Sequence, residues 1–175
     1  MPSDPSHCYL IALGSNVRHV RHGRPPAVLR AALAALEQEG LSIIAAAPVI
    51  GTDPLGPSLR RYANSAALVE STLEPDALLA LLKRIERRFG RRPGGKRWSA
   101  RVLDLDVILW SGGMWSTPGL VVPHVSFRER DFVLRPAVAL APDWRDPVGG
   151  LTLRQLLARL TSPRPLPNAP AWSGP

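Results

Sequence analysis

The chain has 175 residues, of which 45% are hydrophobic, and it carries a formal net charge of +8 at pH 7. This length suits one domain with a single core, and no apolar run approaches the roughly 20 residues that a membrane-spanning helix needs. Because Cys8 is the only cysteine, an internal disulfide and a multi-cysteine zinc site are excluded. The first residues lack the basic and apolar segments of a secretory signal. We therefore expect a cytoplasmic protein with no membrane partner.

The positive charge is concentrated in one segment. Nearly all of it is arginine, since Lys83 and Lys96 are the only lysines. Arginine stays charged and binds phosphate oxygens through paired hydrogen bonds, so a nucleotide or a nucleic acid is expected as partner, although composition alone also fits a preference for arginine codons. A dense basic cluster repels itself unless it is solvated or binds anions. The cluster consists of Arg84, Arg87, Arg88, Arg91, Arg92, Lys96, Arg97 and Arg101, with Glu86 as its only acid.

In chain order, the first part of the sequence predicts three strands and one helix. Residues 8–13 form a short apolar run that predicts a strand, and residues 14–16 end it. Pro25 opens a helix that Gly40 terminates. Residues 41–50 and 62–71 predict the second and third strands, with a loop rich in proline and glycine between them.

The second part begins with the clearest helix of the chain, which Pro75 opens and Gly90 ends. Its apolar face, with helical spacing, consists of Leu78, Leu81, Leu82, Ile85 and Phe89. A strand is predicted at residues 102–110, an arginine-bearing turn near Arg130 and a last helix at residues 151–160. No linker or repeat divides the chain. We expect one domain over residues 1–162 and a proline-rich, disordered tail over residues 163–175.

The predicted order of elements is strand, helix, strand, strand, helix, strand. This order predicts an α+β fold with a ferredoxin-like antiparallel sheet (a βαββαβ core) and helices on one of its faces. Ferredoxin-like sheets also bind RNA by stacking bases on exposed aromatic side chains. The function therefore has to be inferred from the site, not from the fold.

Asp104 and Asp106 form an unusual acidic pair inside a predicted strand. Side chains alternate along a strand, so both aspartates share one face, roughly 6–7 Å apart, and the opposite face points to a core and carries Leu103, Leu105, Val107 and Leu109. Two like charges on one face repel each other and need a compensating divalent cation or arginine. Magnesium binds one or two carboxylates together with phosphate oxygens, so the pair fits a metal–nucleotide site. By itself the pair also fits a solvent-facing strand with two surface acids.

The neighbouring residues favour the metal site. Arg97, Trp98 and Arg101 precede the aspartates, and a metal–triphosphate site needs cations beside its carboxylates. The chain has no Gly-x-x-x-x-Gly-Lys-Ser/Thr loop, so it is not a P-loop protein. Carboxylates on a central strand disfavour the RNA-binding alternative, because they repel a phosphate backbone. His124 could contact a phosphate or be structural, and Asn64 could read a polar heterocycle.

Residues 97–106, Arg-Trp-Ser-Ala-Arg-Val-Leu-Asp-Leu-Asp, closely resemble the signature of the 6-hydroxymethyl-7,8-dihydropterin pyrophosphokinase family. The signature is long and mixed in chemistry, so a chance match is not expected. The resemblance runs from about residue 9 to residue 160. Other segments that fall in the family's order are residues 11–16, 52–57, 62–64, 84–86, 122–124 and 130–134.

The resemblance implies an enzyme that transfers the β,γ-diphosphate of ATP to the hydroxymethyl group of the pterin, releasing AMP, in tetrahydrofolate biosynthesis. It implies two magnesium ions on Asp104 and Asp106, with Arg91 and Arg101 holding phosphates during transfer. The ATP contacts that it implies are Glu86, Trp98, Leu105, Val107, His124 and Arg130. The pterin contacts that it implies are Thr52, Asp53, Leu55, Tyr62, Asn64 and Phe132, with the two aromatic rings sandwiching the pterin. We expect a monomer with ATP and a hydroxymethyl-dihydropterin as partners and no nucleic acid.

The chain departs from the family pattern at several loop positions. Ser99-Ala100 stands where members commonly have Gly-Pro, and Val17-Arg18-His19 stands where Gly-Asp is frequent. Pro93 replaces an arginine that some members carry. These departures leave both predicted metal ligands in place. They keep a second interpretation open, in which the chain is a divergent paralogue that acts on or binds another pterin.

Overall fold

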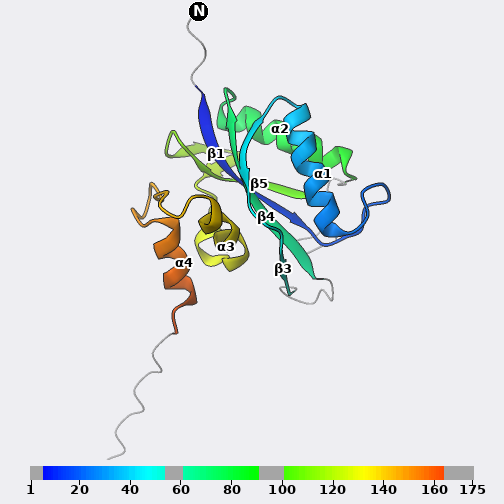
Figure 1. The fold of residues 1–175 in the computed structure, drawn as a ribbon. Coiled ribbons are helices and arrows are strands. Elements are labelled where there is room, and N and C mark those ends of the chain that lie inside the picture. Colours follow the sequence, from blue (N-terminus) through cyan, green and yellow to red (C-terminus); the bar gives the residue numbers. More distant parts are fainter. Residues whose placement is uncertain (1–5, 54–60, 91–100, 164–175) are drawn as a thin grey trace, which may run out of the picture.

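The structure, a computed structural model, describes residues 6–53, 61–90 and 101–163 (Figure 1). Its strands are β1 (His7–Ser15), β2 (Ser42–Ala46), β3 (Ile50–Thr52), β4 (Tyr62–Ser71), β5 (Asp104–Trp110), β6 (Trp115–Thr117) and β7 (Leu120–Val122). Its helices are α1 (Pro25–Gln38), α2 (Pro75–Arg88), α3 (Asp131–Leu140) and α4 (Leu153–Thr161), and a 3-10 turn η1 covers Phe127–Glu129.

Strand β1 lies inside the sheet and pairs antiparallel with β4 on one side and with β5 on the other. Strands β2 and β3 both pair antiparallel with β4, so the order across the sheet is β2-β4-β1-β5. Strands β6 and β7 form a separate two-stranded hairpin. The expected combination of helices with an antiparallel sheet is confirmed.

Helices cover the sheet on both faces, whereas the sequence predicted them on one face only. Helices α1 and α2 pack over Tyr9, Ile11 and Leu13 of β1 and form one core with them. Helices α3 and α4 form a second core around Leu10, which points to the opposite face of β1. Figure 1 shows α1 and α2 together on one side of the sheet and α3 and α4 on the other. Gly14, farther along β1, stays partly exposed, so this second face is less covered towards the end of β1.

Several element boundaries agree with the sequence pattern. Strand β4 spans the predicted residues 62–71, and α1 and α2 begin at the predicted Pro25 and Pro75. Gly40 and Gly90 follow these helices with φ angles of 90° and 91°, a left-handed conformation that favours glycine at a helix end. Among the residues that the structure describes, no helix is both long enough and apolar enough to cross a membrane.

Two elements differ from the prediction, and proline is the physical reason in both. The single strand predicted at residues 41–50 is divided into β2 and β3 around Pro48, which cannot donate a sheet hydrogen bond. The turn predicted near Arg130 continues directly into helix α3, which contains Pro136. A proline inside a ten-residue helix removes a backbone hydrogen bond and obscures the helical pattern in the sequence.

A buried ion pair joins η1 to the segment that leads into α4. Asp146 is fully buried, and it accepts hydrogen bonds from Arg128 Nε and Nη2, both at 2.6 Å, and from Val148 N at 3.0 Å. Burial alone would raise the pKa of Asp146, but the hydrogen bonds from Arg128 and Val148 outweigh it and hold the pKa below its ordinary value. The pair thus anchors the turn that directly precedes Arg130 and α3.

We expect Asp146→Asn to lower the free energy of unfolding by about 3 kcal/mol at pH 7, because Arg128 loses its buried counter-charge. The folded-state pKa lies below that of the unfolded chain, so this stabilisation is present above about pH 4 and is lost as the pH falls further. Urea unfolding at a series of pH values measures both effects.

The matched control for this variant is Asp143→Asn, which removes an exposed ion pair with Arg154 at 3.4 Å. The control should change the free energy of unfolding by less than about 0.5 kcal/mol. Equal losses in the two variants would contradict a structural role for the buried pair.

Candidate active site

From Asp104 to Val107, strand β5 presents its residues alternately to the two faces of the sheet, as the sequence predicted. The prediction that Leu109 faces the same core as Leu105 is wrong, because a register shift in the pairing of β1 with β5 places Leu109 in the second core beside Ile108. Leu105 and Val107 are buried in the core beneath α1 and α2. Asp104 and Asp106 remain partly exposed, with side-chain exposures of 23% and 32%. Because side chains alternate along a strand, the two carboxylates share the face opposite that core.

The register of the sheet brings Asn64 to the same face as the carboxylates. Gly14 of β1 is the direct partner of Asn64 on β4 and of Asp104 on β5. Directly opposed residues in an antiparallel pair project to the same face. Neighbouring strands lie about 4.8 Å apart, so Asn64 and Asp104 are separated by about 10 Å, with only a glycine between them.

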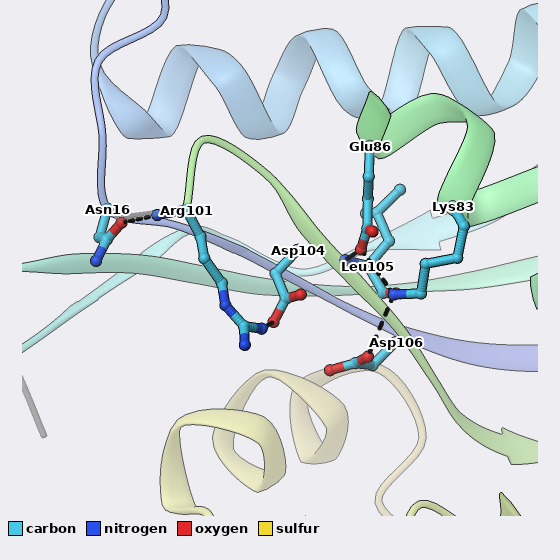
Figure 2. Close-up of polar contacts among 7 residues, drawn as sticks. All are labelled: Asn16, Lys83, Glu86, Arg101, Asp104, Leu105 and Asp106. Carbon is cyan, nitrogen blue, oxygen red and sulfur yellow. Dashed lines mark hydrogen bonds and ion pairs between the residues drawn. The ribbon is translucent and has the colours of Figure 1, made fainter. Parts of the chain in front are cut away.

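Each aspartate has a cation from the protein beside it. Arg101 Nη1 donates to Asp104 Oδ2 at 2.6 Å, and Lys83 Nζ lies 4.0 Å from Asp106 Oδ1. Figure 2 shows Arg101 on the segment before β5 and Lys83 on α2, reaching the aspartates from different elements. These two contacts supply compensating positive charge for the acidic pair.

Strand β5 lies at the edge of the sheet and not at its centre, where the sequence predicted it, and Glu86 holds it against helix α2. Glu86 is fully buried, and its Oε1 accepts hydrogen bonds from Leu105 N at 2.7 Å and from Lys83 Nζ at 2.9 Å. Lys83 Nζ also donates to Leu105 O at 3.2 Å (Figure 2). Both backbone polar groups of Leu105 are therefore bound by side chains of α2, which take the place of a neighbouring strand. This arrangement holds the backbone between the two aspartates.

Lys83 is a residue of this site that sequence reasoning did not select. A lysine three residues before a glutamate resembles an ordinary surface pair on a helix. Only the packing of α2 against β5 directs it towards Leu105 and Asp106. The one sequence signal that could have found it is its identity, since lysine is rare in this arginine-rich chain.

Asn16 joins the end of β1 to the segment before β5. Asn16 N donates to Arg101 O at 3.0 Å, and Arg101 N donates to Asn16 Oδ1 at 2.7 Å. Its Nδ2 is buried and has no acceptor among the residues that the structure describes. Because a buried donor without an acceptor is costly, Asn16 is a candidate to donate a hydrogen bond to an incoming polar group.

His124 is held beside β5 as a neutral imidazole. Its backbone N donates to Ile108 O at 3.0 Å, and its Nδ1 accepts from Ser126 N at 3.2 Å. Burial lowers the pKa of His124, Asp106 raises it and Arg130 lowers it, and the net result is a pKa below the ordinary value. Near neutral pH, the proton of the ring therefore lies on Nε2, which is a hydrogen-bond donor.

A second group of predicted residues lies on β3, β4 and α3. Thr52 and Tyr62 are direct partners in the sheet, and Asn64 Nδ2 donates to Thr52 Oγ1 at 2.7 Å. Phe132 packs against the second core, and the guanidinium of Arg130 lies 5.9 Å from the centre of its ring. These contacts hold the Asn64 amide in one orientation and place an aromatic ring at the start of α3.

The remaining predicted site residues are less constrained or lie elsewhere. Asp53 forms an exposed ion pair with Arg61 at 3.3 Å, and its side chain is 88% exposed. Leu55, Arg91 and Trp98 lie outside the described residues. The structure thus brings the predicted acidic pair, Arg101 and Asn64 to one region. It does not test the predictions for Leu55, Arg91 and Trp98.

The carboxylates fit magnesium when phosphate completes the coordination. Among residues 6–53, 61–90 and 101–163, no group of three or more His, Cys, Asp or Glu side chains could hold a metal ion. Magnesium usually keeps several waters and binds through one or two carboxylates plus phosphate oxygens of the substrate. Asp104 and Asp106 therefore have the donor chemistry for a metal that binds together with a nucleotide.

An α+β domain that carries paired carboxylates with cations beside them is the combination expected of a metal- and nucleotide-dependent transferase. The chain matches the family model described as 7,8-dihydro-6-hydroxymethylpterin-pyrophosphokinase (HPPK) over residues 10–142. It is 39% identical over 150 residues to the 2-amino-4-hydroxy-6-hydroxymethyldihydropteridine pyrophosphokinase of Pseudomonas aeruginosa, and the match covers 85% of this chain and 88% of the relative. The chain belongs to the HPPK family.

Other relatives agree with this assignment. The 2-amino-4-hydroxy-6-hydroxymethyldihydropteridine pyrophosphokinase of a Synechocystis species is 33% identical over 172 residues, which cover 97% of this chain and 86% of that protein. A folate synthesis bifunctional protein of Arabidopsis thaliana is 34% identical over 132 residues, which cover 75% of this chain and 26% of that protein.

Solved structures show the same fold. A crystal structure of Plasmodium falciparum HPPK-DHPS with pterin and p-hydroxybenzoate has a TM-score of 0.64 at 13% identity over 90% of this chain. An HPPK-DHPS structure in complex with substrates has a TM-score of 0.70 at 11% identity over 89% of this chain. This chain spans 44% and 45% of those two chains, so it corresponds to less than half of each.

We expect Glu86→Ala to lower the free energy of unfolding by about 3 kcal/mol, because Leu105 N–H loses its acceptor and Lys83 loses its buried counter-charge. Chemical denaturation measures the loss. The control is Glu37→Ala, which truncates an exposed glutamate on α1 and should change stability by less than about 0.5 kcal/mol. If Glu86→Ala is as stable as this control, Glu86 does not fasten β5.

Proposed function

We propose that the chain transfers the β,γ-diphosphate of ATP to the hydroxymethyl group of 6-hydroxymethyl-7,8-dihydropterin and releases AMP, as a step of folate synthesis. Membership of the HPPK family and the names of the relatives support this reaction. The structural observation that carries it is the shared sheet face of Asp104 and Asn64, on the two sides of Gly14. A carboxylate suited to a metal–phosphate and an amide suited to a heterocycle thus face one narrow gap.

The reaction forms one phosphorus–oxygen bond and breaks another. The hydroxyl oxygen of the pterin bonds to the β-phosphorus, the bond from that phosphorus to the α,β-bridging oxygen breaks, and AMP leaves with this oxygen while the hydroxyl proton is released. Such transfers depend on positioning and electrostatic stabilisation and need no covalent enzyme intermediate. Residues that hold the two substrates in line are therefore sufficient for catalysis.

Asp104 and Asp106 are the residues that would hold two magnesium ions against the triphosphate. When bound, these ions would neutralise charge on the phosphate oxygens. Arg101 now pairs with Asp104 at 2.6 Å, and a metal on this carboxylate would free the guanidinium to bind a phosphate oxygen. Arg91 would provide a second guanidinium, a role assigned from its sequence position alone.

The ATP side of the site extends along β5 and its surroundings. His124 would donate from Nε2 to a phosphate oxygen, and Arg130 and Trp98 would contact the nucleotide. Glu86 is fully buried, so its contribution to ATP binding would pass through the backbone of Leu105, which it holds. Leu105 and Val107 would border the nucleotide through their backbone, because their side chains point into the core.

The pterin side of the site lies on β3, β4 and α3. Tyr62 and Phe132 would stack on the two sides of the pterin ring. Asn64, oriented by Thr52, would read the polar edge of the heterocycle. Asp53 and Leu55 would complete this edge, a role that for Leu55 is assigned from its sequence position alone.

The proposal also covers the fold, the domain bounds, the location and the oligomeric state of the protein. With β3 set aside as an addition, the element order β1-α1-β2-β4-α2-β5 and the strand order β2-β4-β1-β5 support a ferredoxin-like core. We propose one catalytic domain over residues 1–162, with residues 163–175 as a tail. A cytoplasmic monomer that binds no nucleic acid stays a prediction. The carboxylates on the sheet face support only the last part of it, because they would repel a phosphate backbone.

We expect Asp106→Ala to reduce AMP formation from ATP and 6-hydroxymethyl-7,8-dihydropterin by at least about 100-fold, because the metal loses a ligand. The variant should keep the circular dichroism spectrum of the wild type, since Asp106 is partly exposed. The control is Asp143→Ala, an exposed aspartate near α4 that should leave the rate unchanged. Full activity of Asp106→Ala would contradict the metal assignment.

A further inference from the structure

Gly14 lies on β1 between the two halves of the proposed site. Its direct sheet partners are Asn64 on β4 and Asp104 on β5, so all three project to one face. Asn64 is a proposed pterin contact and Asp104 a proposed metal ligand. In the proposed reaction, the pterin hydroxyl and the metal-bound phosphates would therefore meet beside the backbone of β1 at this residue.

The backbone conformation does not require glycine at this position. Gly14 lies inside β1 and lacks the positive φ angle that explains the glycines at positions 23, 40, 90, 113 and 150. Glycine inside a strand is also unfavourable relative to alanine, because it loses more conformational freedom on folding. An advantage of glycine over alanine at this position therefore has to come from the space that glycine leaves free.

The space above Gly14 is bounded by the two functional side chains. A Cβ atom at this position would lie 3.4 Å from Asn64 Oδ1 and 4.0 Å from Asp104 Cβ. The shorter distance is at the tight end of ordinary contacts, so a methyl group fits there but fills the gap. The hydrogen bond from Asn64 Nδ2 to Thr52 Oγ1 holds the Asn64 amide in place, which prevents it from moving aside freely.

We propose that Gly14 determines specificity for the substituent on the pterin ring: its missing side chain leaves the room that the hydroxymethyl group occupies between Asn64 and Asp104. This inference rests on the proposed function and adds a residue to it. A hydroxymethyl group is a carbon with a hydroxyl, and a methyl side chain at position 14 would compete for the same volume. The ring itself, held by Tyr62, Phe132 and Asn64, would still bind.

The test compares two ligands that differ only at this substituent. The binding of 6-hydroxymethyl-7,8-dihydropterin and of unsubstituted 7,8-dihydropterin is measured by calorimetry on the full chain, each with Mg2+ and a non-hydrolysable ATP analogue present. For Gly14→Ala we expect the Kd of the hydroxymethyl compound to rise by about tenfold or more, because the added methyl group and the hydroxymethyl group together overpack the gap. The Kd values of the unsubstituted ring and of the ATP analogue should stay within about twofold of those of the wild type.

The matched control is Gly51→Ala, the same change on the neighbouring strand β3. A Cβ atom there would meet only Arg61 Nη2, at 3.7 Å, among the described atoms within 4 Å. This control should change neither pterin affinity. Gly14→Ala is expected to fold, because a strand accepts alanine and the added Cβ atom comes no closer than 3.4 Å to any atom of the residues that the structure describes.

Other results would contradict either the role of Gly14 or the proposed function. If Gly14→Ala weakens both pterins equally, or weakens neither, the residue does not sense the substituent and the inference is wrong while the proposed function stands. If Gly51→Ala reproduces the selective loss, the effect does not belong to the gap and the inference is also wrong. If the wild type binds neither pterin, the proposed function fails, and the inference fails with it.

Discussion

The repulsion between Asp104 and Asp106 is the constraint around which this part of the molecule is arranged. Two carboxylates on one strand face are unfavourable unless positive charge lies close by. Arg101 and Lys83 supply that charge from two different elements, and Glu86 in turn fixes Lys83 and the backbone of Leu105. Contacts within the protein therefore stabilise the acidic pair, in the position where the proposed metal–phosphate would bind.

Each helical layer covers one face of the sheet, and only the second face has an end that is suited to ligands. Helices α1 and α2 bury one face of the sheet, which carries apolar residues of β1, β4 and β5. Helices α3 and α4 bury the opposite face around Leu10 and Ile108. Farther along β1, small or polar residues replace the apolar ones, so that end of the face is suited to ligands. The buried pair of Arg128 and Asp146 anchors the turn before α3, which is where Arg130 and Phe132 begin that layer.

Periodicity in the sequence was sufficient to predict most of the sheet, and the resemblance was sufficient to predict the family. The alternation of leucine and aspartate in β5 depends on nearest neighbours along a strand, so it could be predicted from the sequence alone. The last helix was predicted as well, at residues 151–160, and is found as α4 at Leu153–Thr161. Helix α3 and the position of both helices on the second face could not be predicted, because Pro136 interrupts the pattern of α3 and because the choice of face depends on how the whole chain packs. Likewise, the pairing of Lys83 with Leu105 and Asp106 connects residues more than 20 positions apart, and no local pattern encodes that distance.

What the sequence by itself determined is the inventory of the site: an acidic pair on one strand face, a basic segment before it and a signature shared with a pyrophosphokinase family. These features are local, and local sequence carries them. What only the tertiary structure decided is which groups oppose one another across strands. Gly14 lies between Asn64 and Asp104 because the register of three antiparallel strands aligns them, and register is set by the packing of the complete sheet. Similarly, a buried Glu86 holds the edge of β5 because α2 packs there and leaves Leu105 no neighbouring strand on that side.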